Sequence, residues 1–168
     1  MLNRMIRAIK LDPTLYEEVE ADRTATTQAM VIVALVALVT GIAAADAGFA
    51  FVVWGILFGL LGWAAWASIT YFVGTRLIPE QNTRADWGQM ARGLGFAQSV
   101  GFLRVFGALP VIGWVVLLIV TIWQAAAMVI AVRQALDYTS TLRALAVVLI
   151  GGVPYVVLLL LIAGPEVD

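Results

Sequence analysis

The sequence contains no cysteine and no histidine. This excludes a disulfide framework, the usual zinc, haem and iron–sulfur ligand sets, and every thiol- or imidazole-dependent nucleophile. No glycine-rich run precedes a Lys-Ser or Lys-Thr pair, and the apolar stretches hold no paired carboxylates for acid–base work. We therefore expect no metal site, no cofactor and no enzymatic activity.

Charged residues are also scarce, at 12% of the chain with a net charge of −1. This balance supplies no general basic field for nucleic acid, so we expect no such partner. Apolar residues make up 62%, well above the roughly 45 to 50% of soluble domains. Together with a mean hydropathy of +0.98 over 168 residues, this predicts one small all-α integral membrane domain in contact with the lipid bilayer.

Five apolar stretches have lengths near the roughly 17 to 25 residues that cross a bilayer as a helix. They are Ala29–Ala45, Phe49–Val73, Leu94–Val111, Trp114–Val132 and Thr141–Ile162. The third is the weakest, because Gln98, Ser99 and Arg104 interrupt it. We expect a polytopic bundle of five transmembrane helices, with a tight turn over residues 46–48 between the first two.

The basic residues outside these stretches all fall on one side of the five-span layout. They are Arg4, Arg7, Lys10, Arg23, Arg76, Arg84, Arg92, Arg133 and Arg143. The other side carries only three acids, Asp46, Glu166 and Asp168. Because positive residues favour the cytoplasm, this predicts a cytoplasmic N-terminus and an external C-terminus. The domains expected are a cytoplasmic tail over 1–28, a membrane domain over 29–163 and an external tail over 164–168.

The N-terminal tail predicts two short helices. Apolar residues between Leu2 and Ile9 recur at the spacing of one helix face, opposite basic residues, which is typical of a helix lying at a membrane surface. Asp12 followed by Pro13 predicts the N-cap and first residue of a second helix. The acids of that helix fit either a leaflet surface or a solvated face, and both interpretations stay open.

Arg104 is the most informative single residue. Counted from Leu94 at about 1.5 Å per residue, its Cα falls near the middle of the bilayer, where a charge costs about 2.5 to 3.5 kcal/mol. Its side chain leans toward the N-terminus of its helix, so we expect it to reach toward lipid phosphates or toward the acids Glu80, Asp86 or Asp137. Two interpretations stay open, a structural role and a role in handling a substrate or lipid. Nearby glutamines are candidates for a polar network with it, namely Gln98, Gln124 and Gln134.

Two further patterns concern packing and helix ends. Gly55, Gly59 and Gly62 form a stripe of small residues that predicts close approach of a neighbouring helix, within the bundle or in a homodimer. Arg133 and Asp137 are four residues apart, which predicts a helical neighbour pair at the cytoplasmic end of the fourth span. This pair fits a turn that anchors two helices, or a ligand site.

Several segments together resemble the Yip family of polytopic membrane proteins. They are LYEEVEADRTATTQA from Leu15, ITYFVGTRL from Ile69, RGLGFAQSVGFLRVFGALPVIGW from Arg92 and IWQAAAMVIAVRQALDYTSTLRAL from Ile122. The resemblance implies five spans and a cytoplasmic N-terminus, and in eukaryotic members a link to vesicle trafficking and membrane shaping. This chain lacks their Asp-Leu-Tyr-Gly-Pro motif and their longer N-terminal region, so it is similar to prokaryotic members, which implies a cytoplasmic membrane.

Two hypotheses for the function follow. The first is a non-enzymatic protein that organises the membrane or binds a membrane-protein partner through its tail and second loop. The alternative is a small transporter or lipid-handling protein that uses Arg104 and Gln98, acting either as a single copy or as a homo-oligomer.

Overall fold

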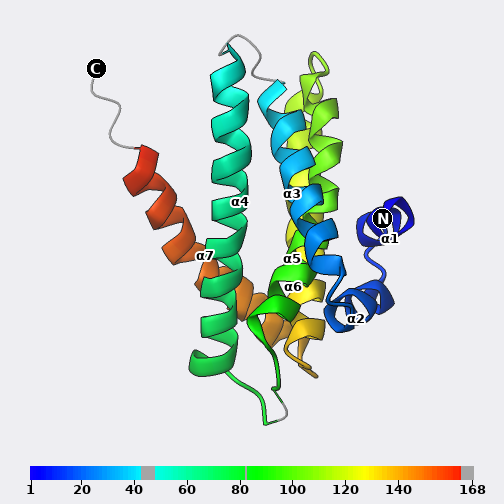
Figure 1. Ribbon diagram of the computed structural model, residues 1–168, viewed down its shortest axis with the longest axis vertical. Helices are drawn as coiled ribbons and strands as arrows, with labels where there is room; N and C mark the ends of the chain where they lie inside the picture. Colours follow the sequence, from blue (N-terminus) through cyan, green and yellow to red (C-terminus); the bar gives the residue numbers. More distant parts are fainter. Residues whose placement is uncertain (43–47, 82, 164–168) are drawn as a thin grey trace.

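The computed structural model describes residues 1–42, 48–81 and 83–163. All elements of this part are helices, which confirms the all-α prediction (Figure 1). In chain order they are α1 (Leu2–Ile9), α2 (Pro13–Ala21), α3 (Ala25–Ile42), α4 (Gly48–Phe72), the π-helix η2 (Val73–Leu77), α5 (Trp87–Ala97), the 3₁₀-helix η3 (Gln98–Ala108), α6 (Gly113–Ala135) and α7 (Thr141–Ala163). Most of the turn predicted over 46–48 and the tail over 164–168 lie outside the described residues.

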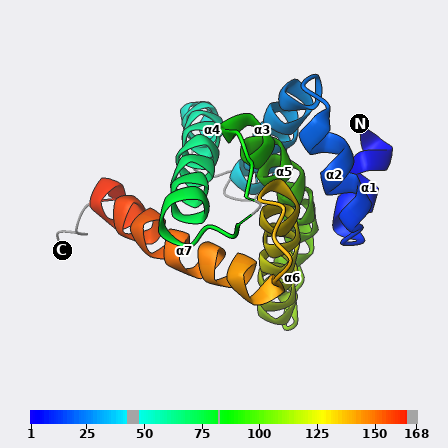
Figure 2. The same cartoon turned by 90° about the horizontal axis from the view of Figure 1, so that it is seen from below.

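The long helices form an elongated bundle. α3, α4, α6 and the pair α5–η3 run side by side along the long axis, and α7 crosses α4 obliquely (Figures 1 and 2). α1 and α2 lie across one flank of the bundle, and we call them the N-terminal head (Figure 1). α2, the loop after η2 and the turn between α6 and α7 lie toward one end, the head end, while α1 lies on the flank about half-way along the bundle (Figure 1). The turn after η3 lies at the opposite, far end.

The third apolar stretch begins earlier than expected. The prediction placed its start at Leu94, but α5 begins at Trp87 because Asp86 and Gln89 form a capping box. The Asp86 carboxylate accepts a bond from the Gln89 backbone N–H, and the Gln89 side chain accepts one from the Asp86 N–H. The sequence pattern missed this start because polar residues of the first turn preceded the apolar run.

α5 is the central helix of the bundle. All its residues from Met90 to Ala97 are buried, and it contacts α2, α3, α4 and α6. Its glycines permit this crowding, since a Cβ at Gly95 would lie only 2.6 Å from the Cβ of Ala29 on α3. The Trp63 indole of α4 donates to the Ala91 carbonyl at 3.0 Å. α5 therefore fixes the positions of the surrounding helices and of η3, which continues it.

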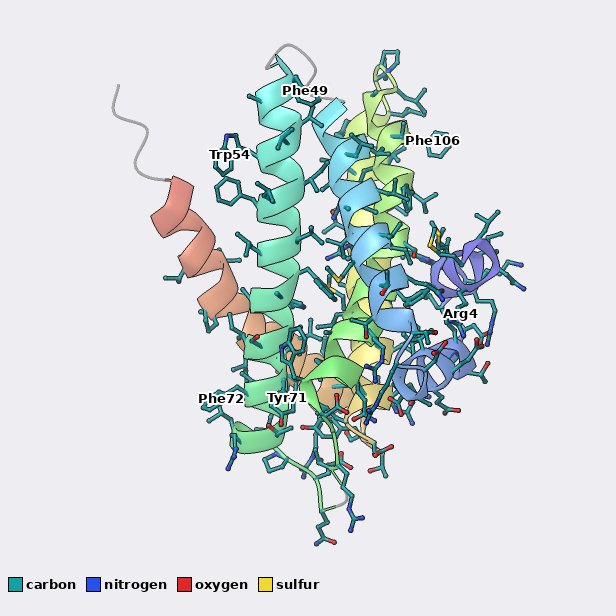
Figure 3. All side chains as sticks on the ribbon, viewed as in Figure 1. Arg4, Phe49, Trp54, Tyr71, Phe72 and Phe106 are labelled. Atoms are coloured by element: carbon teal, nitrogen blue, oxygen red, sulfur yellow. The ribbon has the colours of Figure 1, made fainter. Side chains whose placement is uncertain are left out.

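Large apolar side chains remain exposed around the bundle. Figure 3 shows Phe49, Trp54 and Phe72 along α4 and Phe106 on η3, and all four point away from the core. Among the described residues, two helices have the length and composition to cross a membrane, Val52–Leu77 and Gly113–Ala135. Shorter apolar helices cover Ala25–Thr40 and Thr141–Pro154. Such exposed surface is typical of a protein whose solvent is lipid.

Candidate functional site

Arg104 lies on a face of η3 that repeats every third residue. A 3₁₀-helix has about three residues per turn, so Gln98, Gly101, Arg104 and Gly107 lie one above another. A Cβ at Gly101 would lie 2.7 Å from Cγ1 of Val36, which places this face against α3. The same Cβ would lie 3.2 Å from Nη1 of Arg104, so the guanidinium leans back over Gly101, as the sequence predicted.

Arg104 lies nearer the far end of its helical segment than the sequence predicted. Four residues separate Arg104 from the end of η3. At a rise of about 2.0 Å per residue, its Cα therefore lies about 8 Å from that end of the helix. The mid-bilayer position assumed a start at Leu94 and an α-helical rise, and both assumptions were wrong. The guanidinium forms no hydrogen bond or ion pair with any residue that the structure describes, including the acids proposed as its partners.

The predicted polar contact between Gln98 and Gln124 is present. Nε2 of Gln124 on α6 donates to Oε1 of Gln98 at 2.5 Å. Gln124 is buried, and its Oε1 has no partner within the described part of the chain; the same holds for Oγ of Ser99. Gln134 lies elsewhere, where its Nε2 donates to the Glu17 carboxylate of α2 at 2.8 Å. The interior network thus consists of Gln98 and Gln124, without Gln134.

Ion pairs hold the two helices of the N-terminal head together. Arg4 of α1 pairs with Glu18 at 2.8 Å and with Asp22 at 2.9 Å, and Arg7 pairs with Asp12 and Glu18. The hydrogen bond from Arg7 keeps the pKa of the Glu18 carboxyl below its usual range. Asp12 also caps α2 by accepting from the Thr14 N–H, as predicted. Arg4 and Arg7 are therefore neutralised within the head.

Arg92 attaches the head to the bundle. It belongs to α5 and is only 5% exposed. Its Nε donates to the Val19 carbonyl at 2.9 Å, and its Nη2 donates to the Glu20 carbonyl. These are carbonyls of the last turn of α2, which have no acceptor role inside that helix. The arginine thus caps α2 from the centre of the bundle, and no local sequence spacing pointed to this contact.

Glu20 has a half-buried carboxyl beside this contact. Its Oε2 is buried without a hydrogen-bond partner among the described residues. Burial raises the pKa of Glu20 to about 7, and the charges of Asp137 and Glu17 act in the same direction. Arg92 lowers this pKa by a smaller amount. The protonation of Glu20 therefore changes near neutral pH.

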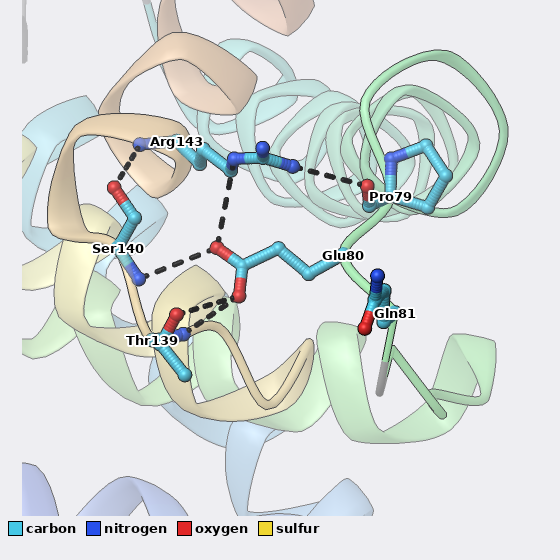
Figure 4. A pocket seen from close by; sticks show the side chains of 6 residues that line it. All are labelled: Pro79, Glu80, Gln81, Thr139, Ser140 and Arg143. Atoms are coloured by element: carbon cyan, nitrogen blue, oxygen red, sulfur yellow. Dashed lines mark hydrogen bonds and ion pairs between the residues drawn. The ribbon is translucent and has the colours of Figure 1, made fainter.

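The loop after η2 is fastened to the turn before α7. The Tyr138 hydroxyl lies 2.8 Å from the carbonyl of Gly74 and 2.7 Å from that of Ile78, and it has one proton to donate to them. Glu80 accepts from the backbone N–H groups of Thr139 and Ser140 and lies 3.7 Å from Nε of Arg143 (Figure 4). These backbone bonds lower the pKa of Glu80. An open cavity of about 640 Å³ adjoins this junction.

A comparison with known protein families identifies the architecture. The sequence model of the Yip1 domain matches residues 13–162. The chain belongs to the Yip1 domain family. No curated protein and no solved structure matches it. The Yip1 domain therefore extends from the start of α2 almost to the end of α7, and it includes Arg92, Arg104 and the Tyr138 junction. Membership in this family makes the chain a membrane protein of the Yip type.

Within the Yip1 domain, the predicted Arg133–Asp137 pair is wrong. α6 ends at Ala135, and Asp137 has a φ of 54°, so it lies outside the helix in a left-handed turn. Arg133 instead donates to the carbonyls of Tyr138 and Thr139 at 3.2 and 3.4 Å. No ion pair joins Arg133 to Asp137 in the described structure. The structure does form an anchoring turn here, but Arg133 makes it through backbone carbonyls.

The small-residue stripe on α4 divides into different environments. A Cβ at Gly59 would lie 3.0 Å from the Cβ of Ala37, so Gly59 marks the close contact with α3. A Cβ at Gly55 would meet nothing within 4 Å, and Gly62 is half-exposed. The prediction of one continuous packing face is therefore wrong within this chain, although its central residue packs as expected.

Proposed function

We propose that this chain is a non-enzymatic five-span protein that binds a membrane-protein partner through its N-terminal head. In this proposal the head end faces the cytoplasm, the C-terminus is outside, and the membrane is the cytoplasmic membrane of a prokaryote. The prokaryotic assignment rests on the absence from this sequence of the Asp-Leu-Tyr-Gly-Pro motif of eukaryotic relatives. The absence of cysteine, histidine and paired catalytic carboxylates supports a role in binding.

Helix lengths support five crossings. α4 and α6 have 25 and 23 residues, or about 37 and 34 Å, against a hydrocarbon thickness of about 30 Å. α5 and η3 each have 11 residues, and together they extend about 38 Å because the 3₁₀ segment rises about 2.0 Å per residue. The segment that looked weakest in sequence is thus long enough to cross. α3 and α7 have 18 and 23 residues.

Charge placement supports the orientation. Every lysine and arginine except Arg104 belongs to the head, its link to α3, the loop after η2, the first half of α5, or the end of α6 and start of α7. These segments lie at the head end, except α1, which lies on the flank about half-way along the bundle (Figure 1). Positive residues are retained in the cytoplasm, which favours a cytoplasmic head end.

α1 supports a position of the head at the membrane surface. The Trp123 indole of α6 donates to the Ile9 carbonyl at 2.7 Å, which fixes the end of α1 against the bundle. Leu2 and Ile6 remain exposed on α1, which packs against η3 and α5. An amphipathic helix with exposed apolar residues and a neighbouring tryptophan is typical of the headgroup region.

The observation that carries the proposal is the attachment of the head by Arg92. A charged residue buried at the centre of the bundle fixes α2, so the polar surface of α2 keeps a constant orientation. Thr14, Glu17 and Glu18 are exposed on that surface. A preorganised surface loses less conformational entropy on binding than a flexible tail does, which suits a docking face.

Site-specific photo-crosslinking in native membranes tests this proposal. We expect a photoreactive residue at Thr14 or at Glu17 to give the same discrete protein adduct, identified by mass spectrometry. The same probe at Val153, which is exposed on α7, is expected to label mainly lipid. Adding the Arg92→Met change should weaken the head adduct. Lipid adducts alone at both head positions would refute the partner-binding role.

A further inference from the structure

A cavity beside Arg104 is not explained by partner binding at the head end. It measures about 300 Å³ and lies between α3, η3 and the first half of α6. Its lining residues are Val39, Thr40, Arg104, Val105, Gly107, Ala108 and Leu117. Thr40 uses its hydroxyl proton in a bond to the Val36 carbonyl. The cavity is thus an apolar space with one guanidinium in its wall.

The glycines of η3 leave the guanidinium accessible in this cavity. Gly101 and Gly107 lie one turn before and one turn after Arg104 on the same face of the 3₁₀-helix. A Cβ at Gly101 would lie 3.2 Å from the Arg104 guanidinium, and a Cβ at Gly107 would lie 2.5 Å from Leu117. Side chains at these positions would crowd both the cation and the opposite wall. The spacing therefore keeps the space around the charge open.

The Arg104 guanidinium has no anionic partner among the described residues, although Arg4, Arg7 and Arg143 all have one. Arg104 also lies apart from them, in the far half of the bundle. In a bilayer an arginine at this position needs a counter-ion or a polar partner, and such residues typically mark functional sites. No described residue supplies that counter-ion.

We propose that this cavity binds a phosphate group through Arg104. A guanidinium presents a planar fork of donors that matches two phosphate oxygens, and such bidentate bonds are among the stronger ones in proteins. The apolar lining and the neighbouring exposed Val105 and Leu118 fit acyl chains, so a phospholipid is the source that the surroundings favour. The Arg104 guanidinium leans away from the far end. The phosphate of the bound lipid would therefore lie deeper in the bilayer than the phosphates of the surrounding lipids.

This inference uses the membrane layout proposed above but does not depend on the partner-binding role. A titration of purified, delipidated protein in detergent, read by native mass spectrometry, tests it without any partner present. The probes are dioleoylphosphatidylglycerol and, separately, inorganic phosphate. The variants are Arg104→Gln, Arg104→Lys and Val39→Trp, which fills the cavity and keeps the charge. Arg76→Gln is the matched control, since Arg76 is exposed on η2 at the head end.

We expect the wild type to bind one phosphatidylglycerol at least about tenfold more tightly than Arg104→Gln does, a factor that follows from the loss of charged hydrogen bonds. Arg104→Lys should fall between them, Val39→Trp should lose the bound lipid, and Arg76→Gln should match the wild type. Displacement of the lipid by inorganic phosphate in an Arg104-dependent way would assign the site to soluble phosphate. Equal affinity of the wild type and Arg104→Gln for both probes would overturn the proposal. If Arg104→Gln does not fold, unchanged binding by Val39→Trp would overturn it.

Discussion

Replacing Arg92 with methionine is expected to release the N-terminal head while the bundle stays folded. Methionine fills a similar volume but supplies no donor, so the carbonyls of Val19 and Glu20 both lose a charged hydrogen bond. Hydrogen bonds to charged groups contribute about 1.5 to 3 kcal/mol each, which gives a loss of about 3 kcal/mol or more. Arg92 also counteracts the rise in the pKa of Glu20, so its removal adds an unfavourable charge effect.

Hydrogen exchange followed by mass spectrometry measures this release locally. A loss of about 3 kcal/mol corresponds to roughly 100-fold faster exchange, if α2 exchanges by detaching from the bundle. We expect this acceleration over Pro13–Ala21 and little change in α6. Arg84→Met is the matched control, because Arg84 is an exposed loop arginine. Protection of α2 that is the same in both variants would refute the capping role of Arg92.

Three further perturbations have expected outcomes. Burial raises the pKa of Glu20 in the folded protein to about 7, above its ordinary value of 4.5. Attachment of the head is therefore strongest below pH 4.5 and weakens as the pH rises to about 7. The Glu20→Gln change should remove this pH dependence, as measured by hydrogen exchange of α2 between pH 5 and 8. Tyr138→Phe should lower the free energy of unfolding in detergent by about 1 to 3 kcal/mol, since the carbonyls of η2 lose their donor, whereas Tyr71→Phe should have little effect. Gly59→Leu should cost about 1 to 3 kcal/mol by overpacking against α3, while Gly55→Leu, which meets open space, should be nearly neutral in thermal unfolding.

Sequence patterns located most of the long helices, because the extent of an apolar run in the sequence corresponds to the extent of the helix. The runs predicted from Thr141 and from Trp114 begin within one residue of α7 and α6. The third run failed at its start, because the capping box at Asp86 contains polar residues that an apolar window excludes. The 3₁₀ geometry of η3 was also missed, although the glycines spaced three residues from Arg104 are visible in the sequence.

The candidate sites were harder to predict, because their contacts join distant parts of the chain. The bond from Arg92 to Val19 spans 73 residues, and the bond from Tyr138 to Gly74 spans 64. A spacing rule covers only neighbours on one helix, and it gave the wrong partner for Arg133, since it assumed that α6 continues through Asp137. Gln98 and Gln124 were predicted to interact because they are polar residues within apolar runs, and amide groups in an apolar interior require hydrogen-bond partners.

Single-cysteine labelling tests the five-span layout most directly, because the natural chain has no cysteine. Gln81→Cys lies in the loop at the head end, Leu109→Cys in the turn at the far end, and Glu166→Cys near the C-terminus. A membrane-impermeant maleimide added to intact cells should label Leu109→Cys and Glu166→Cys at once, and should reach Gln81→Cys only after the membrane is opened. Labelling of Gln81→Cys in intact cells, with Leu109→Cys protected, would contradict the proposed orientation and the cytoplasmic role of the head.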